Sequence, residues 1–372
     1  MSSAVATTPA KVPAPRLAAL DVFRGVTILL MLLVNNIALD TATPAHLTHA
    51  EWTGRVHVAD MVFPWFLLAV GVAVPFAVAS HRKRETGWLG YYVKATKRTA
   101  TLILFGIVVD STVNRAWTPG LGVLQVIGLA YLVAAFLSPL RTAYRGACAA
   151  VLLAAHTAGI LLWHVPGGGA GAFTQEANAV AYLNATYLQP LGLKGLVSVI
   201  PTAALVLIGT MLGDLFRRAD MSLSRRALFC AGFGMLLVAL GYAGSGVLPM
   251  NKPLWTATYI LYMAGLGAIL FALLHRLVDG AKSGAALAFP LIVPGSNAIS
   301  AYVLPILVKV NVLQGWTVAA STGRVSVQTA LQTACYDAAG RVGGGWLYTI
   351  GYIAVWWCVL YYFYRKQWFL RV

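Results

Sequence analysis

Long apolar stretches alternate with short polar ones along almost the whole chain. Each apolar stretch is about 20 residues long, the length of helix that crosses a hydrocarbon core of roughly 30 Å. Inside lipid such a stretch must be helical, because a helix pairs all of its own backbone groups. The pattern predicts ten membrane-crossing helices, at 17–38, 58–80, 95–113, 120–138, 144–163, 195–215, 227–247, 255–277, 287–308 and 345–364.

Composition agrees with this pattern. The 372 residues are 59% hydrophobic and only 10% charged, whereas soluble domains carry about 25% charged residues. This excludes a soluble globule, a nucleic-acid-binding protein and a secreted disulfide scaffold. Three of the four cysteines fall in apolar windows and one stands alone, so neither a disulfide framework nor a metal site is indicated. We expect an all-α integral membrane protein, with residues 1–15 a disordered cytoplasmic tail and 16–372 a single transmembrane domain.

The distribution of lysine and arginine predicts the orientation. Nineteen of the 27 basic residues fall on the side of the amino terminus and seven on the opposite side. Cytoplasmic loops are the basic ones, so both termini are predicted to be cytoplasmic. The external side then holds three long connections, at about 39–57, 164–194 and 309–344. Two glycine-rich stretches, PGGGAGAF and RVGGGW, lack the features of a phosphate loop and are interpreted as flexible connections.

Polar residues occur at both ends of the first helix. Asp21 and Arg24 share a helix face near its cytoplasmic end, which predicts either a structural ion pair or a direct role in binding a phosphate-bearing ligand. Asn35 and Asn36 follow the apolar run at the external end. An amide there could cap the helix or hold a carbonyl oxygen in a cavity, and position alone does not separate these alternatives.

The next segment, LTHAEWTGRVHVADMVFPWF, is unusually rich in titratable and aromatic residues. His49 has the chemistry for proton abstraction near neutral pH, although an interfacial histidine is more often structural. Trp52 could form a wall for a sugar ring or anchor the chain at the membrane surface. Asp60 begins the second helix and could cap it. His57, three residues earlier, could be oriented by Asp60 and is a rival base.

Other polar residues lie in or beside later helices. Such residues usually form hydrogen bonds between helices rather than bind ligands. Lys252 has a more specific interpretation, as a lone external cation suited to an anionic group or a carbonyl. The group comprises Gln125, Asn251, Lys252, Trp255, Ser296, Asn297 and Tyr302.

Taken in order, these motifs resemble the heparan-α-glucosaminide N-acetyltransferase family over essentially residues 16–372. The resemblance runs through RLAALDVFRGVTILLMLLVNN, HAEWTGRVHVADMVFPWFLLAVGVAVPF, GVLQVIGLAYLVAA, NKPLWTATYIL, PGSNAISAYVL and YYFYRKQWFLRV. Its most specific parts are the DxFRG helix start, the asparagine at the helix exit and the His-Ala-x-Trp box.

The resemblance implies a membrane acyltransferase that moves acetyl from cytosolic acetyl-CoA to the amine of a glucosamine-type sugar on the other side. His49, which opens the box, would be the catalytic histidine, acting as a base or as a transient acetyl carrier, and Asn35 the motif asparagine. We expect sugar contacts from Trp52, Asp60, Asn251, Lys252, Trp255 and Asn297. We expect acetyl-CoA contacts from Gln125 and Ser296 and, on side and charge alone, from Arg24, Lys97 and Arg98.

Two departures from the family pattern alter these expectations. Thr53 stands where the box usually has asparagine, so an acceptor contact could differ, and Val126 follows Gln125 where arginine is common. The chain looks bacterial, with the enzyme in the inner membrane and the sugar in the periplasm, and the resemblance alone suggests a homodimer. A sugar transporter and an O-acetyltransferase of an envelope glycan are the alternatives.

Overall fold

A computed structural model describes residues 17–52, 55–82, 87–281, 284–320 and 323–370. These residues are mostly helical, as predicted, with two short antiparallel hairpins in addition. The tail expected at 1–15 and the departure at Thr53 lie outside the described residues.

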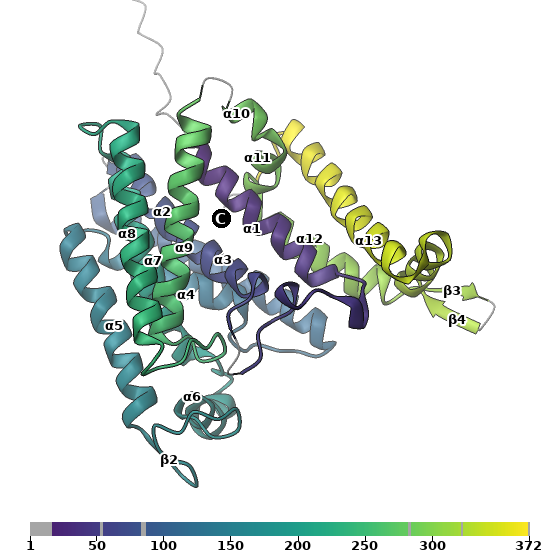
Figure 1. Ribbon diagram of the computed structural model, residues 1–372, viewed down its shortest axis with the longest axis horizontal. Coiled ribbons are helices and arrows are strands. Elements are labelled where there is room, and N and C mark those ends of the chain that lie inside the picture. Colours follow the sequence, from purple (N-terminus) through teal and green to yellow (C-terminus); the bar gives the residue numbers. More distant parts are fainter. Residues whose placement is uncertain (1–16, 53–54, 83–86, 282–283, 321–322, 371–372) are drawn as a thin grey trace, which may run out of the picture.

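The long helices bear the labels of Figure 1. They are α1 (Ala18–Asn36), α2 (Val58–Arg82), α3 (Gly87–Asn114), α4 (Val123–Leu137), α5 (Thr142–Leu162), α7 (Val199–Arg217), α8 (Leu223–Gly244), α9 (Ala257–Leu274), α12 (Ala298–Val308) and α13 (Val327–Arg365). Short helices are α6 (Ala179–Leu183), α10 (Gly284–Leu287) and α11 (Phe289–Gly295), and single turns are η1 (Asp40–Ala42), η2 (Ala45–Leu47), η3 (Asn184–Leu188), η4 (Gln189–Leu191), η5 (Leu196–Ser198), η6 (His275–Asp279) and η7 (Lys309–Leu313). The strands are β1 (His164–Val165), β2 (Gly169–Ala170), β3 (Thr317–Ala320) and β4 (Gly323–Ser326).

Nine of the ten predicted windows each fall on one long helix, and the window 287–308 falls on two shorter ones, α11 and α12. Seven helices of the described chain are long and apolar enough to cross a membrane, or eight if α11 and α12, bent by 74° at a short break, count as one span. The other two windows fall on α3, which is more polar, and on α4, whose 15 residues are short for a crossing. The structure therefore supports a multi-pass membrane protein, while the number ten and the orientation of the termini stay predictions.

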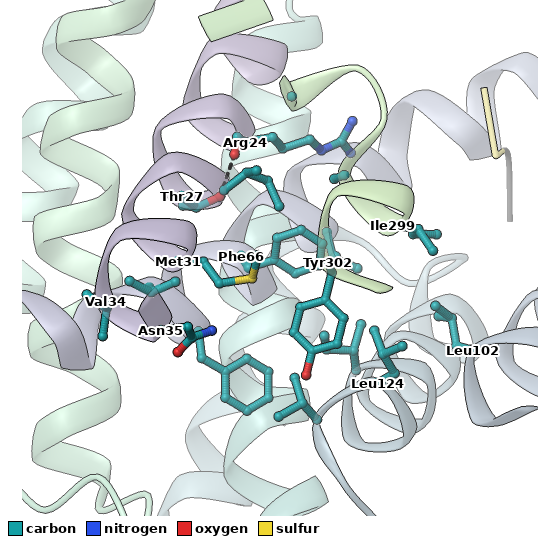
Figure 2. A pocket seen from close by; sticks show the side chains of 18 of the residues that line it. Arg24, Thr27, Met31, Val34, Asn35, Phe66, Leu102, Leu124, Ile299 and Tyr302 are labelled. Atoms are coloured by element: carbon teal, nitrogen blue, oxygen red, sulfur yellow. Dashed lines mark hydrogen bonds between the residues drawn. The ribbon is translucent and has the colours of Figure 1, made fainter. Parts of the chain in front are cut away.

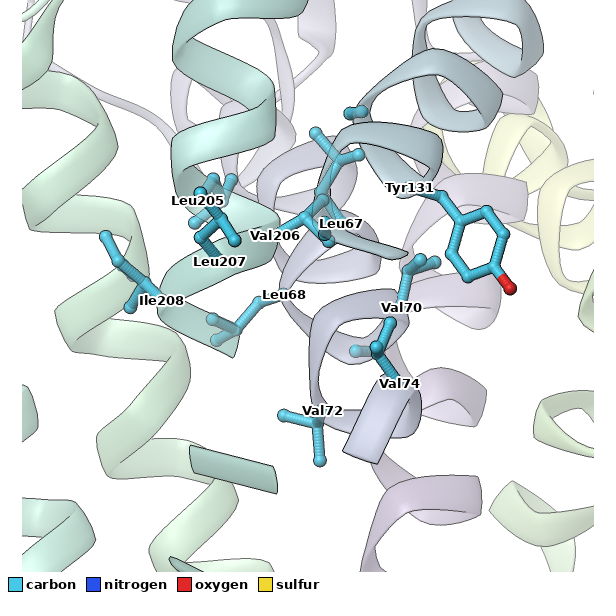
Figure 3. Close-up of a cluster of buried hydrophobic side chains, with 14 of the residues drawn as sticks. Leu67, Leu68, Val70, Val72, Val74, Tyr131, Leu205, Val206, Leu207 and Ile208 are labelled. Atoms are coloured by element: carbon cyan, nitrogen blue, oxygen red, sulfur yellow. The ribbon is translucent and has the colours of Figure 1, made fainter. Parts of the chain in front are cut away.

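Helices α2 and α7 pack closely against each other in the core. Buried leucine and valine side chains of both helices meet there (Figure 3). The backbones approach so closely that a Cβ added at Gly71 would lie 2.2 Å from the Val206 carbonyl oxygen. In lipid the hydrophobic effect does not bring helices together. Small residues therefore stabilise such a crossing, because they let the helices pack closely.

Helix α1 runs through the middle of the molecule, with α8 and α9 on one side and α13 on the other (Figure 1). The Asp279 carboxylate accepts a hydrogen bond from the Ala18 backbone N–H at 2.9 Å, which satisfies a free donor at the start of α1. At Gly25 an added Cβ would lie within van der Waals overlap of the Leu291 carbonyl, so α1 and α11 also touch backbone to backbone. These contacts fix the helix on which the site is built.

The described part of the connection predicted over 309–344 contains regular elements. It contains η7, the β3–β4 hairpin and the first part of α13, which extend beyond the bundle (Figure 1). The prediction that RVGGGW is a flexible connection is wrong. Its residues are helical, after a break at Ala339 and Gly340, and a Cβ at Gly345 would overlap the Ala38 carbonyl oxygen. The glycines serve close packing at the break in α13.

The crossing of α2 and α7 yields a stability prediction. Gly71→Ala should destabilise the protein by about 1–3 kcal/mol, because the new methyl group would displace the backbone around Val206. Gly159→Ala is the matched control, since nothing lies within 4 Å of a Cβ built at Gly159 in α5. Unfolding of the purified protein in detergent measures both. Equal stability of the two variants would contradict the packing described here.

Candidate active site

A cavity of about 530 Å³ opens among α1, α2, α3, α4 and the break between α11 and α12 (Figure 2). This size is typical of a small-molecule site, which usually measures about 300–1,000 Å³. Its walls are mostly apolar, with a few polar groups at the ends. They consist of Arg24, Thr27, Ile28, Met31, Val34, Asn35, His49, Ala59, Val62, Phe63, Phe66, Val70, Arg98, Leu102, Val123, Leu124, Ile127, Lys252, Gly295, Ser296, Ala298, Ile299, Tyr302 and Leu370.

The cavity is elongated along α1. Arg24 and Asn35 both line it, and Thr27, Met31 and Val34 of the same helix lie between them (Figure 2). Eleven residues of α-helix rise by about 16 Å, so the two ends are separated by about half of a hydrocarbon core. A molecule with a charged end and a long, uncharged arm fits such a shape.

Two arginines line one end of the cavity. Arg24 Nη1 lies 3.8 Å from Asp21 Oδ1, which confirms the ion pair predicted from their spacing. The Arg98 guanidinium lies over the ring of Tyr131, with 4.5 Å from Cζ to the ring centroid. Guanidinium groups hold phosphates through paired N–H donors. Ser296 lines the cavity too, and its hydroxyl donates to the Val293 carbonyl oxygen at 2.8 Å.

The other end of the cavity holds a histidine, an aspartate and a lysine in mutual contact. Asp60 Oδ1 lies 2.9 Å from His49 Nδ1 and 3.3 Å from Lys252 Nζ, and Lys252 Nζ lies 3.0 Å from the same histidine nitrogen. His49 and Lys252 line the cavity, whereas the Asp60 side chain is only 2% exposed behind them. Sequence alone gave no reason to expect these three side chains to meet.

The contact with Asp60 assigns the protonation of the His49 ring. A carboxylate only accepts hydrogen bonds, so Nδ1 of a neutral His49 carries the proton and Nε2 keeps its lone pair. Lys252, which only donates, then pairs with the carboxylate rather than with the ring nitrogen. Burial lowers the pKa of the Lys252 ammonium, and the Asp60 carboxylate opposes this effect. His49 is thereby oriented as a proton acceptor with 58% of its side chain exposed.

Asp60 also fixes the loop that carries His49. Its Oδ2 accepts hydrogen bonds from the backbone N–H groups of Ala50 and His57, both at 3.1 Å. The ring of His57 turns elsewhere, with Nδ1 3.1 Å from the Thr48 carbonyl oxygen. The expectation that Asp60 orients the His57 ring is wrong, since the carboxylate contacts His57 only through the backbone and orients His49 instead.

The two asparagines at the end of α1 take different roles. Asn35 lines the cavity (Figure 2), and its backbone carbonyl accepts a hydrogen bond from Lys309 Nζ at 2.7 Å. Asn36 is buried and donates to the Leu32 carbonyl oxygen one turn back at 2.8 Å. The alternatives left open by the sequence are thus divided between neighbours, and Asn35 is the one available to a ligand.

Three predicted sugar ligands lie behind the cavity instead of on its wall. Trp52 Nε1 donates to the Phe173 carbonyl oxygen at 2.8 Å, and Asn251 Nδ2 donates to the Trp52 carbonyl oxygen at 2.8 Å. Trp255 is buried against Phe63, which does line the cavity. In this structure these side chains support the loops around His49 and Lys252, and sugar contacts from them stay predictions.

Other predicted ligands also lie off the cavity wall. Asn297 holds the carboxyl-terminal segment, donating to the Trp368 carbonyl oxygen at 2.8 Å. Gln125 is fully buried and donates to Asp110 at 2.8 Å and to the Gly120 carbonyl oxygen. Lys97 is exposed and absent from the lining. Of the residues expected to contact acetyl-CoA, only Arg24, Arg98 and Ser296 reach the cavity.

Sequence reasoning did not assign several side chains that the structure brings to the cavity. Tyr302 projects into its centre between α1 and α4 (Figure 2), although it was expected to be glue between helices. Phe63 and Phe66 form apolar wall, which no pattern distinguishes from ordinary core.

No group of three His, Cys, Asp or Glu side chains in the described part of the chain could hold a metal ion.

Fold and site together define a multi-pass membrane protein with a histidine–aspartate pair at one end of an elongated internal cavity. A family model described as "Heparan-alpha-glucosaminide N-acetyltransferase, catalytic" matches residues 16–242, and the chain belongs to this family. Heparan-alpha-glucosaminide N-acetyltransferase of Homo sapiens is 27% identical over 356 residues, covering 78% of this chain and 52% of the relative. That of Mus musculus is 25% identical, with 78% and 53% covered. The chain spans about half the length of these relatives.

The buried carboxylate yields a prediction about energetic coupling. Lys252→Met should destabilise the protein because it leaves the Asp60 carboxylate buried without its charged partner, and Asp60→Asn should do so because it leaves the Lys252 ammonium, 26% exposed, without its anion. The double variant should lose less than the two single losses combined, by about 1 kcal/mol or more. Chemical unfolding in detergent micelles gives the four stabilities.

The control is the same set of single and double variants at the exposed pair Arg218–Asp220. Arg218 Nη2 lies 2.7 Å from Asp220 Oδ2, and the two side chains are 57% and 63% exposed. An exposed pair couples by about 0–1 kcal/mol. Additive losses at Asp60 and Lys252 would show that their contact does not hold the site together.

Proposed function

We propose that the protein is a membrane acetyltransferase that moves acetyl from acetyl-CoA to the amine of a glucosamine-type sugar. The observation that carries this proposal is the His49–Asp60 contact at one end of a cavity whose other end is lined by Arg24 and Arg98. Membership of the family supports it. A base at one end and cationic phosphate ligands at the other are what a reaction between an amine and a CoA thioester requires.

The reaction needs a deprotonated amine, because an ammonium group has no lone pair with which to attack. The amine attacks in its neutral form: its nitrogen forms a bond to the thioester carbonyl carbon while His49 Nε2 takes one of its two protons. The carbon–sulfur bond then breaks, the acetyl group stays on nitrogen, and the thiolate takes the proton from His49 to leave as the thiol of CoA. Asp60 stabilises the imidazolium formed in between and keeps the ring oriented.

Negative charge develops on the carbonyl oxygen during the attack. Asn35 lines the cavity near this end and can donate its side-chain N–H to that oxygen. Removing one such donor typically costs about 2.7–4 kcal/mol of transition-state stabilisation. The Lys252 ammonium is a positive group at the same end of the cavity, and it balances the negative charge of the Asp60 carboxylate.

Acetyl-CoA would enter from the basic side of the protein. Its phosphates would meet Arg24 and Arg98, and its uncharged arm would follow the apolar wall along α1, past Met31 and Phe66, to the Asn35 end. A charged nucleotide does not cross lipid cheaply, whereas a thin neutral arm can occupy a protein cavity. The sugar would approach from the opposite side, the periplasm for an enzyme of a bacterial inner membrane.

The role of His49 is tested by turnover. His49→Ala should lower kcat by about 10²–10⁴, the usual contribution of a positioned base. Formation of labelled N-acetylglucosamine from labelled acetyl-CoA by the purified protein measures it. His46→Ala is the matched control, since this exposed histidine lies in the same loop, in η2. Full activity of His49→Ala, or an equal loss in His46→Ala, would remove His49 from the chemistry.

The route of acetyl-CoA is tested separately. Arg24→Gln and Arg98→Gln should each raise the KM for acetyl-CoA about tenfold, because each loses a charge-assisted contact to phosphate. Lys97→Gln removes the same charge next to Arg98 but from an exposed position off the cavity, and it should leave KM unchanged. If all three variants behave alike, the arginines contribute only general charge and the proposed binding mode is wrong.

A further inference from the structure

A second pocket, of about 240 Å³, lies at the basic end of the bundle. It opens among the end of α2, the turn between α4 and α5, the start of α5 and the end of α7, and it shares no lining residue with the active-site cavity. Four arginines and one aspartate carry its charge, namely Arg82, Arg141, Arg145, Arg217 and Asp214. The acetyl transfer proposed above uses none of them.

The base of this pocket is a buried ion pair. Arg145 is only 4% exposed and bonds to Asp214 Oδ2, which also accepts a hydrogen bond from the Thr142 hydroxyl at 2.6 Å. Arg145 Nε is buried and has no hydrogen-bond partner among the described residues. Asp214 is therefore already occupied by Arg145, and a buried guanidinium donor remains that an acceptor could satisfy.

The rim of the pocket carries excess positive charge. Arg217 Nη1 lies 3.9 Å from Asp214 Oδ1 and is 38% exposed, and Arg82 and Arg141 are exposed. Helix α5 also begins here, and its N-cap residue Arg141 makes no side-chain hydrogen bond to the free N–H groups of the first turn. Arginines beside a helix N-terminus favour an anion with several oxygens.

The surroundings indicate that this anion lies at the membrane surface. Arg82 Cζ lies 5.0 Å from the centroid of the Trp88 ring, and Trp88, Leu140 and Tyr144 expose aromatic or apolar surface nearby in sequence. Aromatic rings beside basic groups mark the level of lipid headgroups, and basic pockets between membrane helices bind anionic ones. We propose that this pocket binds the phosphate group of an anionic membrane phospholipid.

Native mass spectrometry of the purified protein, titrated with phosphatidylglycerol, tests the proposal. The double variant Arg141→Gln/Arg217→Gln changes the rim and leaves the buried Arg145–Asp214 pair intact. Arg225→Gln/Lys366→Gln removes the same charge from exposed positions outside the pocket at the same end. The rim variant should bind phosphatidylglycerol about tenfold more weakly or worse, and the control should match the wild type.

Two further ligands separate the sources of phosphate. Phosphatidylcholine, which is zwitterionic, should bind both variants and the wild type equally. If inorganic phosphate shows the rim-dependent binding and phosphatidylglycerol does not, the pocket holds a soluble anion and the assignment to lipid is wrong. If the rim variant and the control bind phosphatidylglycerol alike, there is no specific site.

Discussion

The buried carboxylate of Asp60 is the interaction on which the candidate active site depends. A charge taken out of water must be paired and hydrogen-bonded to be tolerated. Asp60 meets this requirement with the Lys252 ammonium, the His49 ring and the backbone N–H groups of Ala50 and His57. The same contacts hold the loop ahead of α2 and the segment ahead of α9 together. One carboxylate thus pairs the nearby charge and also orients the His49 ring that the proposed reaction uses.

The second constraint is the position of α1. Its first turn is bonded by Asp279, its middle touches α11 through Gly25, and its last turns reach the loop of His49. Because the helix runs the length of the cavity, it separates the arginine end from the His49 end by a fixed distance. A rigid helix of this kind lets a donor held at one end present its reactive group at the other.

The membrane helices could be predicted from sequence because hydrocarbon thickness sets their length. His49 and Asn35 both line the cavity, but position in the sequence did not single them out; the family resemblance did, and their chemical roles stay predictions. His57 is closer to Asp60 in sequence than His49 is, yet the carboxylate pairs with the His49 ring. This could not be predicted, because it depends on how the loop before α2 folds back onto Asp60. Helical structure at RVGGGW was missed for a related reason. Glycine suggests flexibility locally, but here it permits backbone contact with Ala38, which is distant in sequence.

Acetyl transfer through the cavity along α1 is tested by giving the two substrates on opposite sides of a sealed membrane. Proteoliposomes would hold glucosamine inside and receive labelled acetyl-CoA outside. Protease mapping would identify the preparations in which the basic side of the protein faces outward. Labelled N-acetylglucosamine should form inside vesicles that carry the wild-type protein, and almost none should form with His49→Ala. Product that forms only when both substrates are on the same side would contradict a reaction through the cavity along α1.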